Sequence, residues 1–83
     1  MDNAQLLELL KLKLGIATKL RDKPLEKIIE AVITELEDNL GVSLESENAE
    51  HQMFVVDFAA FRYEGGVDIP RHLLWRLHNL KLR

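Results

Sequence analysis

Apolar residues recur at helical spacing along most of the chain, and the clearest run extends from residue 22 to residue 40. Leu25, Ile28, Ile29, Val32, Ile33, Leu36 and Leu40 follow the i, i+3, i+4, i+7 rule. Asp22 is predicted to cap this helix, Pro24 suits its first turn, and Gly41 is predicted to end it. The other side of the helix is charged, which is typical of a surface that faces solvent or a partner.

A shorter amphipathic helix is predicted from about residue 4 to residue 14. Asp2 or Asn3 is its expected N-cap, and Gly15 is its expected stop. Leu6, Leu7, Leu10 and Leu14 fall on one side of it, and Leu9 and Leu12 fall on another. The first side is the pattern of a helix facing a core. The second side either packs within the monomer, which we favour, or meets a neighbouring molecule.

A third helix is predicted from about residue 49 to residue 64, after Asn48 or Ser46 as its cap and before Gly65 and Gly66. Its own apolar residues occupy nearly all of its sides, namely Met53, Phe54, Val55, Val56, Phe58, Ala59, Ala60, Phe61 and Tyr63. A helix that is apolar on nearly all sides has to be covered on most of them. We therefore expect this helix to be the central one.

Asp57 is the main polar exception within that third helix. A carboxylate among phenylalanines is costly to bury unless it is paired. Arg62 and Arg76 are plausible partners for it. Alternatively, Asp57 marks the one strip of the helix that faces water.

The last helix is predicted from about residue 70 to residue 80, and Pro70 suits its first turn. Leu73, Leu74, Leu77 and Leu80 are expected to be buried, while Trp75 and Leu82 project from the opposite side. The predicted fold class is therefore all-α. We expect one domain over residues 1–83, a compact bundle of three longer helices plus a short basic C-terminal helix.

Composition restricts the function classes. The 83 residues carry a formal net charge of −3 and no cysteine, which excludes disulfides, thiolate nucleophiles and cysteine zinc sites. A negative net charge argues against general nucleic-acid binding. No signal peptide and no apolar run long enough for a membrane span are recognisable, so we expect an intracellular protein.

The charges are segregated along the chain. Residues 28–61 contain eight acids and no lysine or arginine, whereas residues 69–83 contain four bases and no acid. Patches of opposite sign steer the encounter of two molecules. Two complementary ends on one small domain therefore favour head-to-tail assembly of copies, although a run of charge is often only a solvated face.

The residue types that usually serve catalysis or metal binding do not form a recognisable motif in this chain. His51, His72 and His78 are too few and too scattered for a metal site, and we expect them to be solvated or to cap a helix. Ser43 and Ser46 are the only serines, and neither lies in a nucleophile motif. We therefore predict a protein that is not an enzyme and that needs no cofactor or metal.

Trp75 and Leu82 are the best candidates for a contact surface, with Arg71 and Arg76 beside them. An exposed tryptophan is uncommon in a monomer and enriched at interface hot spots, often next to arginine. The complementary acidic candidates are Glu35, Glu37, Asp38, Glu45 and Glu47. In the alternative arrangement, the last helix tucks Trp75 beneath the first helix.

Four segments in this order resemble a known family: "KLKLGI" (11–16), "DKPLEKIIEAVITELEDNLG" (22–41), "VVDFAAFRYEGG" (55–66) and "IPRHLLWRLHNLKLR" (69–83). The series is similar to the small all-helical head–tail connector, or adaptor, proteins of long-tailed bacteriophages and prophages. Arg62–Tyr63 and Ile69–Pro70 are its most telling positions, and the short loop between Tyr63 and Ile69 departs from the family pattern.

This resemblance implies a structural protein of the virion neck, present in the host cytoplasm during assembly. Copies would form a ring between the portal and the tail-completion protein, around a channel through which DNA passes without specific binding. Self, portal and tail-completion protein are the implied partners, with no membrane. The acidic candidates would face the basic groups of a neighbour or the portal, and the Trp75 side would supply the other contact.

A helix-turn-helix that binds nucleic acid is the alternative. The third helix, Gly65–Gly66 and the basic last helix could imitate that motif, with Arg71, His72, Arg76 and Lys81 on phosphates. A turn longer than about three or four residues and the acidic remainder of the chain weigh against it.

Overall fold

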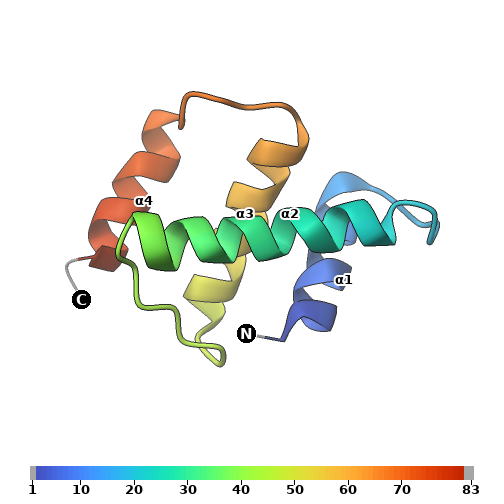
Figure 1. Cartoon of the computed structure of the whole chain (residues 1–83), viewed down its shortest axis with the longest axis horizontal. Helices are drawn as coiled ribbons and strands as arrows, with labels where there is room; N and C mark the ends of the chain where they lie inside the picture. Colours follow the sequence, from blue (N-terminus) through green and yellow to red (C-terminus); the bar gives the residue numbers. More distant parts are fainter. Residues whose placement is uncertain (1, 82–83) are drawn as a thin grey trace.

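The computed structural model describes residues 2–81, and four helices pack together in it (Figure 1). They are α1 (Asn3–Leu14), α2 (Asp22–Thr34), α3 (Ala49–Tyr63) and α4 (Arg71–Lys81), and a π-helical turn η1 (Glu35–Asn39) extends α2. The long α2 crosses in front of α3, with α1 towards one end of the molecule and α4 towards the other (Figure 1). The all-α prediction is confirmed, since the described part of the chain is helical and contains no strand.

Local signals set the ends of α1 and α3. The carboxylate of Asp2 accepts hydrogen bonds from two backbone N–H groups of the first turn of α1, at 3.1 and 3.3 Å. The side-chain oxygen of Asn48 does the same for α3, at 2.9 and 3.2 Å. Gly15 follows α1 with a φ of 72°, a left-handed conformation that glycine adopts without a steric penalty. These caps are the predicted ones.

The predicted cap of α2 is wrong. Asp22 is the first residue of the helix, Arg21 occupies the N-cap position, and no side chain caps the helix there. The carboxylate of Asp22 instead lies 2.7 Å from the Nζ atom of Lys11 on α1. This ion pair between elements replaces the local cap, and an acid in the first turn still complements the helix dipole.

The predicted length of the second helix is confirmed, but its last turn is wider than an α-helical turn. The N–H of Leu40 donates to the carbonyl oxygen of Glu35 at 3.0 Å, five residues back. Gly41 then adopts a φ of 71°, and the N–H of Val42 donates to the carbonyl oxygen of Leu36 at 2.8 Å. The connector that follows therefore begins firmly attached to the end of the helix.

The central position of α3 is confirmed. Its fully buried residues are Phe54, Val55, Val56, Phe58, Ala59 and Ala60, and they meet Leu6 and Leu10 of α1 and Leu25, Ile29 and Val32 of α2. Of the second apolar side of α1, Leu9 packs against this core, whereas Leu12 is exposed. Burial of each large apolar side chain contributes roughly 1.5–3 kcal/mol.

The last helix has a single neighbour. Among the described helices, α4 packs closely only against α3. Leu73, Leu77 and Leu80 form its buried line, as predicted, but the predicted burial of Leu74 is wrong because 47% of that residue is exposed. One neighbour covers only a narrow stripe of α4, and Leu74 lies to the side of that stripe. Leu82 lies outside the described residues.

Candidate functional site

Asp57 joins three helices. Its Oδ2 atom lies 2.6 Å from Nη1 of Arg76 on α4, and its Oδ1 atom lies 3.1 Å from Nζ of Lys13 on α1. Arg76 is one of the two partners predicted from the sequence, so of the two alternatives the ion pair is the one that is confirmed. Lys13 was not anticipated. One carboxylate on the central helix thus fastens a helix on each side of it.

The pKa of this carboxyl group reflects two opposing effects. Burial of Asp57 opposes ionisation, but the hydrogen bonds from Arg76 and Lys13 and the charges of both cations outweigh it. The pKa of Asp57 is therefore lowered below its ordinary value. The group is therefore ionised in the folded protein at neutral pH, as its pairing with two cations requires.

Glu35 and Arg62 form a second ion pair between elements. The Oε2 atom of Glu35 lies 2.6 Å from Nη2 of Arg62. The same guanidinium lies 5.2 Å from the centre of the Phe58 ring and donates through Nη1 to the carbonyl oxygen of Gly66 at 3.1 Å. Glu35, nominated from the sequence as an interface acid, therefore has its partner inside the molecule.

Arg76 is likewise occupied within the fold. Besides its pair with Asp57, its guanidinium lies 5.2 Å from the centre of the Phe54 ring, a cation–π distance. Two of the charged residues nominated for the interface, Glu35 and Arg76, thus hold helices together. Their side chains are about one quarter to one third exposed, at 27% and 33%.

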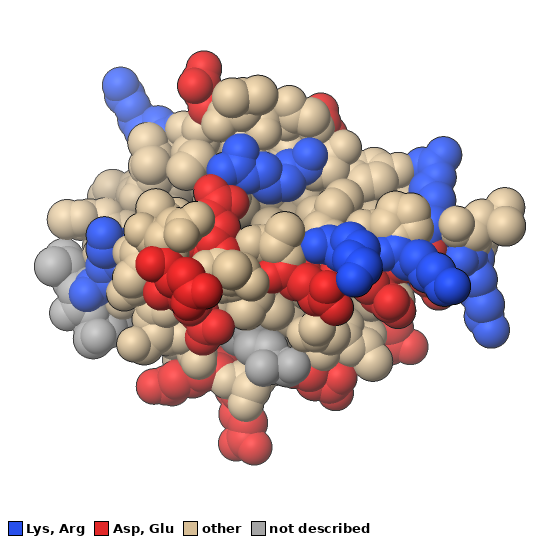
Figure 2. Space-filling view, viewed as in Figure 1, with Lys and Arg blue, Asp and Glu red and all other residues tan. Residues whose placement is uncertain are grey.

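The remaining acidic candidates form a surface. Glu37 and Asp38 on η1, and Glu45 and Glu47 on the connector, are exposed and have no ion-pair partner among the described residues. Acidic side chains gather over the lower part of the molecule, below the end of α2 (Figure 2). We call these four residues the acidic surface.

The outer side of α4 forms an apolar and basic surface. Trp75 is 68% exposed and Leu74 is its exposed neighbour, so the predicted exposure of the indole is confirmed, and the alternative of burial beneath the first helix is wrong. Arg71, His72 and Trp75 line a shallow, mainly apolar depression together with Arg76. We call Arg71, Leu74 and Trp75 the tryptophan surface.

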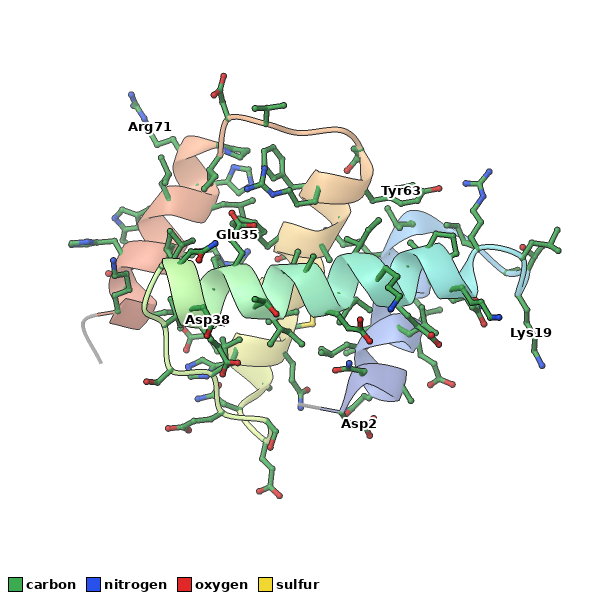
Figure 3. All side chains as sticks on the ribbon, viewed as in Figure 1. Asp2, Lys19, Glu35, Asp38, Tyr63 and Arg71 are labelled. Carbon is green, nitrogen blue, oxygen red and sulfur yellow. The ribbon has the colours of Figure 1, made fainter. Side chains whose placement is uncertain are left out.

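The two surfaces are not at opposite ends of the molecule. Both α4 and the acidic end of α2 lie on the left half of the longest axis (Figure 1), with Arg71 at the upper left and Asp38 below it (Figure 3). The expected separation into an acidic end and a basic end is therefore corrected. The chain folds back so that residues far apart in sequence share one half of the molecule.

His51 is buried, which the sequence interpretation missed. Its Nδ1 atom accepts a hydrogen bond from the N–H of Glu45 at 2.9 Å, so it anchors the acidic connector to α3. The expectation of a solvated histidine is confirmed for His72 and His78, which are exposed. The available signal for His51 was its position in the first turn of a predicted helix, just after a connector. No group of metal-ligating side chains occurs among residues 2–81.

Comparisons with known proteins give no relative: no family model, no curated protein and no solved structure matches the chain. Within residues 2–81, no helix combines the length and the apolar character that crossing a membrane requires.

The loop between α3 and α4 comprises residues 64–70, and it is longer than the roughly three or four residues of a helix-turn-helix turn.

Proposed function

We propose that this protein is a structural assembly protein, a head–tail connector whose copies form a ring between a phage portal and a tail-completion protein. The observation that carries the proposal is the tryptophan surface. Trp75 is 68% exposed and has arginines close to it in the sequence, and tryptophan and arginine are the residue types enriched at interface hot spots. Burying Trp75 against a partner would remove this apolar area from water.

Charge supports the same function. The acidic surface offers four unpaired carboxylates to a basic partner, and the net charge of −3 keeps attraction to DNA phosphates weak. A channel through which DNA slides benefits from such weak attraction. The resemblance of the chain to head–tail connectors supplies the class of partner, and it implies no catalysis and no cofactor.

Mass measurement in solution tests this function. The purified protein, alone and mixed with the portal protein of the phage or prophage that encodes it, is expected to give a ring-sized oligomer or a stable portal complex. Trp75→Ser should weaken that association by about tenfold or more, since hot-spot truncation costs about 2 kcal/mol. Val67→Ser is the matched control, because Val67 is also exposed and apolar but lies on the loop before α4.

The proposal would be overturned if the protein associates neither with itself nor with the portal protein at micromolar concentrations. If the Trp75→Ser and Val67→Ser variants associate equally strongly, the tryptophan surface is not the site of the contact. Salt-dependent binding of short duplex DNA, without any oligomer, would favour the helix-turn-helix alternative instead. That alternative has less support, because Arg76 is engaged with Asp57 and is not free to contact phosphates.

A further inference from the structure

The loop between α1 and α2 has an unusual tip. Leu20 is 89% exposed, more than any other large apolar residue among those described, and Lys19 and Arg21 flank it. Lys23, in the first turn of α2, adds a further exposed cation. A leucine that is almost fully hydrated contributes nothing to the core of its own molecule. We call Lys19, Leu20, Arg21 and Lys23 the basic tip.

The loop is fastened where it joins the rest of the protein. The guanidinium of Arg21 donates a hydrogen bond to the hydroxyl of Tyr63 on α3. On the other side of the tip, the N–H of Ile16 donates to the carbonyl oxygen of Lys11 at 2.9 Å, and the Nζ of Lys11 pairs with Asp22. Both ends of the loop are thereby fixed to helices. A fixed loop loses less entropy when it binds than a mobile one.

The cations of the tip have no ion-pair partner among residues 2–81. Neither Lys19 nor Lys23 makes an ion pair with any described residue, and the nearest acid in sequence, Asp22, is engaged with Lys11. Lys19 lies at the right-hand end of the molecule, and its side chain extends outward from the ribbon (Figure 3). The tip is therefore a protruding basic element with an apolar residue in its middle.

The acidic surface lies towards the other end of the same axis. Along the longest dimension, which measures 37 Å, Lys19 marks one end and Asp38 lies on the opposite half (Figure 3). Leu40 and Leu44 lie between Asp38 and Glu45 in the sequence and are half-buried, so the acidic surface also borders some apolar area. The basic tip cannot reach this surface within one molecule, but it can reach that of another copy.

We propose that the basic tip of one copy docks on the acidic surface of the next copy, with Leu20 as the apolar anchor. The contact joins two different patches, so it is heterologous and generates a closed ring or an open chain of copies. It deepens the proposed function, on which it rests, by naming the contact between neighbouring subunits. The tryptophan surface then remains available for a different partner.

Charge reversal tests the contact. Lys19→Glu with Lys23→Glu makes the tip net acidic, and Glu45→Lys with Glu47→Lys makes the connector part of the acidic surface basic, while Glu37 and Asp38 stay acidic. Each double variant is expected to lose self-association by about tenfold or more, because the charge attraction between the tip and the acidic surface is then reversed or cancelled. Sedimentation equilibrium measures this for the protein alone, or mass measurement of subunits bound per portal where assembly needs the portal.

Mixing the two double variants is the decisive step. Each tip then meets a connector (residues 45 and 47) of opposite charge on the other variant, so the mixture should assemble with alternating copies while neither variant assembles alone. Leu20→Ser should weaken assembly of the otherwise unchanged protein, with Val67→Ser as its matched control. Circular dichroism should show all variants folded, since none of the four reversed side chains makes an ion pair within the described part of the chain.

The outcomes separate this inference from the proposed function. If Trp75→Ser abolishes association but reversal of Lys19 and Lys23 leaves it unchanged, the docking of the tip is overturned and the assembly function stands. If the mixture of the two double variants fails to assemble although the wild-type protein does, the docking of the tip is also overturned. If the wild-type protein associates neither with itself nor on the portal, both are overturned.

Discussion

Replacing Asp57 with asparagine tests whether this one carboxylate fastens α1 and α4 to the central helix. The change keeps the size of the side chain but removes its charge, which leaves the cations of Lys13 and Arg76 facing a neutral amide. The pair with Arg76 is a partly buried, charge-assisted hydrogen bond of 2.6 Å, a type worth about 1.5–3 kcal/mol. Lys13 is 45% exposed and contributes less, about 0.2–1 kcal/mol.

Together these values amount to about 2–4 kcal/mol, of which asparagine retains part as a neutral hydrogen bond, so we expect a net loss of about 2 kcal/mol. For a domain of 83 residues, this corresponds to a fall of roughly 10 °C in melting temperature. Urea and thermal unfolding followed by circular dichroism measure both quantities. Asp68→Asn is the matched control, because Asp68 is exposed and has no partner among the described residues.

The pH dependence provides a second test of the same carboxylate. Because the pKa of Asp57 is lower in the folded protein than in the unfolded chain, its contribution to stability is complete above about pH 5. The contribution is lost as the pH falls through the unfolded value of 3.8 and then through the lower folded value. The difference in unfolding free energy between wild type and Asp57→Asn should shrink accordingly. A difference no larger than that of Asp68→Asn at pH 7 would refute the reasoning.

Two further substitutions test packing and hydrogen bonding. Gly66→Ala should destabilise the fold by about 1–3 kcal/mol, because the added methyl group would overlap the ring of Phe61, and adding Phe61→Leu should recover part of the loss in urea unfolding. His51→Leu should cost about 1–3 kcal/mol and speed hydrogen exchange at the amide of Glu45, which loses its acceptor. Unchanged exchange at that amide would contradict the anchoring role of the histidine.

The sequence predicts those parts of the fold that depend on neighbours along the chain. The caps at Asp2 and Asn48 and the stop at Gly15 follow from backbone groups within a few residues, and all three predictions are confirmed. Asp22 carries the same local signal, but Lys11 approaches it from another helix and takes the carboxylate. Because capping and ion pairing compete for one side chain, the tertiary contact decides the outcome, and it cannot be read from local sequence.

Helix periodicity likewise predicts which side of α4 is buried but not how much of it. Leu73, Leu77 and Leu80 occupy the centre of the apolar stripe and are buried, whereas Leu74 at its edge is not. The difference arises because α4 has one neighbour rather than two. The number of neighbours depends on how the whole chain packs, so the width of a buried stripe is a tertiary property.

Charge segregation along a sequence does not specify charge segregation on a surface. The pairs of Asp57 with Arg76 and of Glu35 with Arg62 join the acidic middle of the chain to later basic residues, and they remove both acids from the free surface. Reversing Arg76 would therefore disturb the fold and any association at once, and its effect could not be assigned. Reversing Lys19, which pairs with nothing in the described chain, changes only the charge that a partner meets. Ion pairs between helices thus decide which charges can serve assembly, and only the unpaired ones can test it.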